Sequence, residues 1–214
     1  METWSRLETR SRLLSMAIRT TGLMILVALL IGSATADAAP LGDDGLHKQE
    51  WFALTFKDVA EDLAEAKADG KRLAIVFEQA ACVYCSKMHN TVLTDPEVVD
   101  YIKQHYIVVQ YNLYGDEEVI DLDGEVLSEK SAAAKWNIMF TPTWLFMPEE
   151  AEGEKDVGAA AVGTMPGAFG KGTFLDLFTW VREKGYDSEE AFQRYHARRI
   201  AERRATGNPD APAD

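Results

Sequence analysis

The two cysteines of this 214-residue chain are the residues best suited to chemistry, because they lie close together in the segment Cys82-Val83-Tyr84-Cys85. A thiol pair at this spacing can form and break one disulfide bond. The segment follows an apolar run at 73–77 and opens a helical pattern, which predicts Cys82 in the first turn of a helix. There, unpaired N–H groups and the positive end of the helix dipole stabilise a thiolate. Cys85 lies one turn further in and is expected to be less exposed. We therefore predict that Cys82 attacks and Cys85 resolves.

Other uses of the pair are less well supported by the surrounding residues. A zinc site needs four ligands, and His89 could supply a third, but no fourth is evident. Haem attachment requires histidine directly after the second cysteine, and that position holds Ser86. A purely structural disulfide stays open, although so short a loop constrains the unfolded chain little. We predict a redox pair with no metal site and no cofactor, and we expect His89 on the helix surface.

The elements that position this motif follow from hydrophobic periodicity and turn residues. The predicted elements are a helix over 55–68, a central strand over 73–77, a helix from 82 interrupted at Asp95-Pro96, a strand over 106–111, an Asp-Gly hairpin over 118–127, a helix over 128–136, strands over 144–147 and 157–162, and a helix over 173–204 interrupted near Gly185. This order predicts an α/β fold with a mixed central sheet flanked by helices. We expect one domain over 51–204, without an internal repeat.

A proline at the start of a late strand is the second feature with chemical potential. It lies in the segment Phe140-Thr141-Pro142-Thr143, and cis peptide bonds are almost confined to X-Pro. The strand order should bring this segment beside the helix start at Cys82. A cis Thr141–Pro142 bond would expose the Thr141 backbone for strand-like pairing with a substrate peptide. The plainer alternative is a proline tolerated at a strand edge.

Together, the strand, the C-x-x-C at a helix start and the late Thr-Pro-Thr resemble the thioredoxin superfamily, over about residues 50–200. The chain is more narrowly similar to periplasmic SoxW-like thioredoxins. The residues that carry this narrower resemblance are Phe77-Glu78-Gln79, Cys82-Val83-Tyr84-Cys85, Lys87-Met88-His89, the hairpin residues 121–124, Ser128-Glu129-Lys130 and residues 140–143. The resemblance implies a thioredoxin fold with a hairpin-helix insertion before the cis-proline strand, and a Cys82–Cys85 disulfide. It also implies electrons from a membrane thiol transporter of the CcdA type.

Two departures from the family pattern affect the redox chemistry. The dipeptide inside the motif is Val83-Tyr84, where Pro-Tyr is commoner in the subgroup and Gly-Pro in ordinary thioredoxins. Val76 stands where ordinary thioredoxins carry a buried acid. Glu78 is then the only local carboxylate that can accept a proton from Cys85, with a solvated glutamate as the alternative. We expect Tyr84 to be exposed and to contact a partner peptide.

The N-terminus has the pattern of a secretory signal peptide over residues 1–38, with an uncleaved anchor as the alternative. Four arginines precede a ten-residue apolar run at 22–31, followed by small residues that fit cleavage after Ala36 or Ala38. The run is half the length of a membrane span, so we expect no stable membrane insertion after cleavage. Residues 39–50 are expected to be a flexible leader and residues 205–214 a disordered tail.

The charge of the chain excludes one class of partner. The formal net charge is −13, and removal of residues 1–36, with four arginines and two glutamates, leaves −15. So acidic a protein lacks the basic face that nucleic acid requires. One basic run stands apart, and we expect it to be a solvated helix face, with docking of an acidic partner as the alternative. It comprises Arg194, Arg198, Arg199, Arg203 and Arg204.

The sequence therefore predicts an exported, periplasmic thiol–disulfide oxidoreductase that reduces disulfides in protein substrates. A disulfide oxidase or isomerase running in the opposite direction is the alternative among enzymes. A thioredoxin-like binding module with an inert cysteine pair is the alternative outside enzymes. Export favours redox chemistry, because disulfides form and persist outside the cytoplasm.

Overall fold

The computed structural model describes residues 39–151 and 155–207. The predicted signal peptide and residues 208–214 of the predicted tail lie outside the described residues. The chain divides into two units, 1–37 and 38–214, and the second carries all the elements below. Within the described ranges, no helix combines the length and apolar character needed to cross a bilayer.

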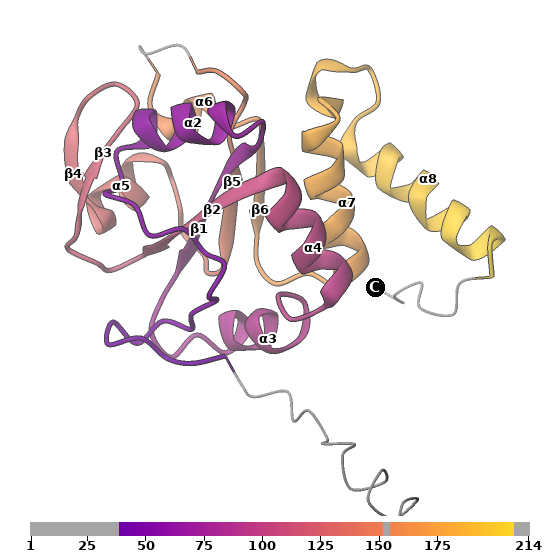
Figure 1. Ribbon diagram of the computed structural model, residues 1–214, viewed down its shortest axis with the longest axis horizontal. Coiled ribbons are helices and arrows are strands. Elements are labelled where there is room, and N and C mark those ends of the chain that lie inside the picture. The colour runs from indigo at the N-terminus through magenta and orange to yellow at the C-terminus, as the bar shows by residue number, and fades with distance from the viewer. Residues whose placement is uncertain (1–38, 152–154, 208–214) are drawn as a thin grey trace, which may run out of the picture. The chain divides into compact units, whose positions relative to one another are not determined.

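A four-stranded mixed sheet forms the centre of the domain, in the order β2-β1-β5-β6 (Figure 1). Strand β1 (Arg72–Glu78) pairs in parallel with β2 (Tyr106–Asn112) and antiparallel with β5 (Thr143–Phe146), which pairs with β6 (Gly163–Pro166). All seven residues of β1 are buried. A strand covered on both faces has no solvent side, which explains its continuous apolar run.

Helices cover both faces of this sheet and divide the core in two. Because side chains alternate along a strand, Ala74 and Val76 of β1 enter one cluster and its neighbours Ile75 and Phe77 enter the other. The first cluster contains side chains of α3 (Val83–Thr91), α4 (Pro96–His105) and α7 (Lys171–Arg182), and the second those of α2 (Val59–Ala68) and α5 (Glu129–Lys135). Figure 1 shows α2 and α7 on opposite sides of the sheet.

The predicted hairpin-helix insertion is present between β2 and β5. Strands β3 (Glu118–Ile120) and β4 (Val126–Ser128) pair antiparallel, and α5 follows directly. The Ser128 hydroxyl accepts a hydrogen bond from the Ser131 amide, which fixes the start of α5. The helix predicted from residue 82 divides at Asp95, whose side chain caps the separate helix α4.

Two predicted elements differ from the structure. The strand predicted over 157–162 is wrong, because the segment forms the short helix α6 (Val157–Ala160), and the strand begins only at Gly163. The Asp156 carboxylate accepts from the Ala159 amide and so favours a helical turn. The helix predicted over 55–68 starts later, at Val59, where Asp58 caps it.

The N-terminal segment 39–50 also differs from its prediction as a flexible leader. Leu46 is buried in it, and Phe52, two positions after the segment ends, packs in the first core cluster. The Gln110 side chain of β2 donates to the His47 carbonyl at 2.8 Å. Because the segment buries Leu46 and is hydrogen-bonded to the sheet, it is part of the domain. Its mostly polar composition was the reason for predicting a flexible leader.

The basic run lies on α8 (Phe192–Ala205), after a short 3-10 turn η1 (Gly185–Asp187), and it is only partly the solvated face expected. Arg198 is exposed and pairs with Glu190 and Glu202. Arg203 instead donates both Nη atoms, each at 2.8 Å, to the carboxylate of Asp176 on α7, which is buried. A bidentate pair of this kind fixes α8 against α7. Ala205, placed in the predicted tail, belongs to this helix.

Candidate active site

Cys82, predicted in the first turn of a helix, is the N-cap of α3 and forms a disulfide with Cys85. The Cys85 amide donates to Cys82 Sγ at 3.1 Å. Cys82 is half-buried, whereas Cys85 is 1% exposed. A partner molecule can therefore reach only the first sulfur, which agrees with the predicted order of attack and resolution.

The loop before β5 completes the surroundings of Cys82. The Thr141–Pro142 peptide bond is cis, which confirms the predicted isomer. The Thr141 hydroxyl donates to Cys82 Sγ at 3.4 Å, and the Thr141 carbonyl oxygen lies 3.7 Å from the same sulfur. Pro142 is buried, and its carbonyl accepts from the Gly167 amide at 2.7 Å. Two donors, one amide and one hydroxyl, thus converge on Cys82 Sγ and are placed to stabilise a thiolate there.

Exposed apolar side chains lie next to both segments that form the reactive centre. Val83 and Tyr84 of the motif are 77% and 65% exposed, and Met139 and Phe140 precede the cis-proline loop with similar exposure. The exposure of Tyr84 was predicted; its contact with a partner peptide stays a prediction. These four residues, which we call the apolar rim, offer a surface for the side chains that flank a substrate disulfide.

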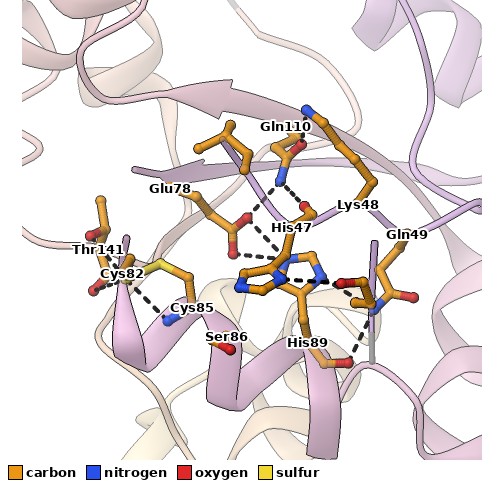
Figure 2. A network of polar contacts seen from close by, with 12 residues as sticks. His47, Lys48, Gln49, Glu78, Cys82, Cys85, Ser86, His89, Gln110 and Thr141 are labelled. Atoms are coloured by element: carbon orange, nitrogen blue, oxygen red, sulfur yellow. Dashed lines mark hydrogen bonds and ion pairs between the residues drawn. A yellow bond between two sulfur atoms is a disulfide. The ribbon is translucent and has the colours of Figure 1, made fainter. Parts of the chain in front are cut away.

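Behind the disulfide, Glu78 and His89 form a buried pair (Figure 2). His89 Nε2 lies 3.0 and 2.9 Å from the two carboxylate oxygens of Glu78. Gln110 Nε2 also donates to Glu78 Oε2, at 2.5 Å. The expectation that His89 lies on the helix surface is wrong, because it shares the inner face of α3 with Cys85 and Met88.

The N-terminal segment reaches this pair from the other side. Gln49 Nε2 lies 3.2 Å from both His89 Nδ1 and the His89 carbonyl oxygen. Lys48 Nζ donates to Gln110 Oε1 at 2.8 Å, and the rings of His47 and His89 are 5.5 Å apart. None of these three residues was predicted from the sequence, since they lie more than 30 positions before the motif. The one available signal was the apolar pair Leu46 and Phe52, which could have marked the segment as packed.

The predicted site residues therefore come together at one end of the sheet. Cys82, Cys85, Thr141 and Pro142 form the reactive centre, Val83 and Tyr84 lie on its surface, and Glu78 lies beneath it. Across the described residues, no group of three or more His, Cys, Asp or Glu side chains is arranged to hold a metal ion.

The fold and this cysteine pair define a thioredoxin-like protein. Residues 59–169, more than half of the chain, match the family model of the thioredoxin-like domain, and the chain belongs to that family. No curated protein matches the chain.

Among solved structures, a thioredoxin-fold protein from Helicobacter pylori is 20% identical, with a TM-score of 0.47 over 65% of this chain and 86% of the other. A thioredoxin from Thermus thermophilus is 25% identical, with a TM-score of 0.46 over 60% and 86%. The oxidoreductase DsbH is 17% identical, with a TM-score of 0.41 over 67% and 94%.

Proposed function

We propose that the protein is an exported thiol–disulfide oxidoreductase that reduces disulfides in protein substrates. The observation that carries this proposal is the asymmetry of the cysteine pair. Cys82 Sγ is reachable and accepts two hydrogen bonds, from the Cys85 amide and the Thr141 hydroxyl, whereas Cys85 is buried behind it. This is the arrangement that an attacking thiolate and a resolving thiol require.

The reaction proceeds in two exchange steps. The Cys82 thiolate attacks one sulfur of the substrate disulfide, forming a mixed disulfide and releasing the other substrate sulfur as a thiolate. Cys85 then loses its proton and attacks Cys82 Sγ. The Cys82–Cys85 disulfide forms, and the second substrate sulfur leaves with the electron pair of the broken bond. The dithiol is oxidised and the substrate disulfide reduced by two electrons.

Substrate binding uses the backbone next to the cis proline. The Thr141 carbonyl lies beside the reactive sulfur, where an extended peptide can pair with it as an added strand. The apolar rim contacts the flanking side chains. Pairing through the backbone admits many sequences, which suits an enzyme that acts on several disulfide proteins.

Export and the source of electrons are further parts of the proposal. The N-terminal arginines, apolar run and small residues support export, and the acidic remainder suits a protein repelled by anionic lipid. A reductase outside the cytoplasm needs a supply of electrons across the membrane. The narrower likeness to SoxW-like thioredoxins supports a CcdA-type thiol transporter in that role.

The test is disulfide reduction with single-cysteine variants. Insulin serves as the probe substrate and dithiothreitol as the electron source. Cys82→Ser should abolish turnover, and Cys85→Ser should accumulate a covalent mixed disulfide visible by mass spectrometry. Ser86→Ala, next to the motif, is the matched control and should retain wild-type turnover. Equal residual activity of the two cysteine variants would contradict the assignment.

The direction of electron flow is tested by the reduction potential of the Cys82–Cys85 pair, measured by equilibration against a thiol buffer. A value near the roughly −270 mV typical of thioredoxin supports a reductase. A value near the roughly −120 mV of strong oxidants makes the protein a disulfide donor, and the proposed direction is then wrong. Thiols that resist iodoacetamide at about pH 6 would favour a binding module instead.

A further inference from the structure

The amide of Gln49 determines which nitrogen of His89 carries a hydrogen. A carbonyl oxygen can only accept, so the Gln49 atom at 3.2 Å from the His89 carbonyl must be the amide nitrogen. The same nitrogen faces His89 Nδ1 at 3.2 Å (Figure 2). An amide N–H facing a ring nitrogen requires that nitrogen to accept. His89 Nδ1 is therefore without hydrogen, and the neutral ring carries its hydrogen on Nε2.

Through the hydrogen on Nε2, His89 donates a hydrogen bond to the carboxylate of Glu78. His89 Nε2 lies 3.0 and 2.9 Å from the two oxygens, and Gln110 donates to Oε2. The orientation of Gln110 is fixed in turn, because its oxygen accepts from Lys48 while its nitrogen donates to Glu78. The pair thus consists of an imidazole that donates from Nε2 and a buried carboxylate that accepts from it.

The carboxylate of Glu78 faces the side of α3 that carries the resolving cysteine. Cys85 and His89 are four residues apart on α3 and both face inward, which places their Cβ atoms about 5–6 Å apart. Figure 2 shows both side chains pointing from α3 toward the strand end that carries Glu78. The inward residue two positions earlier on β1 is Val76, which is buried and apolar and cannot accept a proton.

We propose that Gln49 is a positioning residue for the redox pair, acting through His89 and Glu78 on the proton of Cys85. This inference rests on the proposed function. When Cys85 attacks the mixed disulfide, its proton passes to the Glu78 carboxylate and its sulfur bonds to Cys82 Sγ. The substrate sulfur leaves with the electron pair of the broken bond. By fixing the tautomer of His89, Gln49 keeps the Glu78 carboxylate oriented to accept that proton.

Other titratable groups surround the pair and remain unchanged in the test. They are His47, with its ring 5.5 Å from that of His89, Lys48, which acts through Gln110, and the thiol of Cys82. The aromatic ring of Phe52 closes the remaining side at 5.7 Å from the His89 ring. Only Gln49 contacts His89 Nδ1 among the hydrogen bonds of the described residues.

The experiment compares two substitutions of Gln49 with a matched control. Gln49→Ala removes the donor, whereas Gln49→Glu replaces it with an acceptor that favours a hydrogen on both nitrogens of His89. Gln104→Glu, at an exposed glutamine of α4, makes the same change of charge away from the site. Reduced protein is mixed with glutathione disulfide, quenched in acid at intervals, and analysed for mixed disulfide by mass spectrometry across a series of pH values.

The expected results differ in kind between the variants. Gln49→Ala should slow resolution of the mixed disulfide about fivefold near neutral pH, the effect of one net hydrogen bond. Gln49→Glu should shift the pH profile of resolution to lower pH, because a charged His89 favours the neighbouring thiolate. Nitrogen NMR of the wild-type protein should show His89 protonated on Nε2 alone, and Gln49→Glu should show both nitrogens protonated. Gln104→Glu should match the wild-type protein.

Two results would overturn the inference. One is a wild-type His89 with its hydrogen on Nδ1, a measurement that needs no variant to fold. The other is a pair of folded Gln49 variants whose profiles coincide with that of Gln104→Glu. If Cys82→Ser and Cys85→Ser behave as proposed but the Gln49 variants leave the pH profile of resolution unchanged, only this inference fails. If the cysteine variants themselves fail the insulin test, the oxidoreductase proposal fails first.

Discussion

The hydroxyl of Thr141 offers the most direct test of how the fold activates Cys82. It donates to Cys82 Sγ at 3.4 Å, beside the amide hydrogen bond from Cys85. Thr141→Val keeps the shape of the side chain and removes only this donor. In the reduced protein, the Cys82 thiolate would then keep the amide bond and lose the hydroxyl bond.

The size of the effect follows from these contacts. A hydrogen bond to a charged group contributes about 1.5–3 kcal/mol, and the long contact to sulfur favours the lower end. About 1.4 kcal/mol corresponds to a tenfold change in an equilibrium. Thr141→Val should therefore reduce the thiolate population of Cys82 about tenfold at a given pH below its titration. The pH profile of thiol reactivity should move upward by about one pH unit.

Alkylation of the reduced protein with iodoacetamide measures this directly, because Cys85 is buried and Cys82 dominates the fast reaction. Thr143→Val is the matched control. Thr143 lies two residues after Thr141, at the start of β5, and its hydroxyl donates to the Phe140 carbonyl at 2.7 Å rather than to sulfur. An unshifted profile for Thr141→Val, or an equal shift for Thr143→Val, would refute the role of the hydroxyl.

Two further predictions concern stability and pH. Burial opposes the charge of Asp176, but hydrogen bonds from Arg203 and His196 outweigh it, so its pKa lies below the usual 3.8. Its stabilising effect is present above that value and lost as the pH falls through the folded-state pKa. Asp176→Asn should lower the free energy of unfolding by about 2 kcal/mol near neutral pH, and urea titrations should show the difference vanishing in strong acid. Burial, with smaller effects from nearby carboxylates, raises the pKa of Asp62 to about 6. Between these two values the folded state holds a proton on Asp62 that the unfolded state has lost. The stability that this bound proton contributes is therefore present in full below pH 3.8 and is lost as the pH rises through about 6. Asp62→Asn should raise the urea midpoint at about pH 7 and leave it nearly unchanged near pH 4; the same gain at both would contradict the shift.

The reactive centre could be predicted because its signals are local in the sequence. The apolar run before Cys82 marked a buried strand and the residues after it marked a helix, which placed the thiol at the start of that helix. Cis peptide bonds are almost confined to X-Pro, so Pro142 itself marked where a cis bond could occur, and the Thr141–Pro142 bond is cis. In each case a short segment contains the physical cause of its own conformation.

His89 and Gln49 show where local signals end. His89 was expected on the helix surface, although its position four residues beyond Cys85 on one helical face could have indicated that it is buried with the cysteine. Its partners did not follow from that position, because Glu78 and Gln49 reach it through tertiary packing. The small residues 157–160 posed a different difficulty. They carry no strong periodicity, and the capping carboxylate of Asp156 decided their conformation.

The burial of Cys85 also constrains the kinetics of the proposed enzyme. With one sulfur reachable, an electron donor and an oxidised substrate must use Cys82 in turn and cannot be bound covalently together. Turnover should then follow double-displacement (ping-pong) kinetics. The electron donor reacts with the oxidised protein and the substrate with the reduced protein, so each partner at high concentration should compete for the form with which the other reacts. The apolar rim must accordingly recognise two different proteins, one that delivers electrons and one that receives them. If the protein acts as proposed, one exposed surface has to serve both docking partners and cannot be specialised for either.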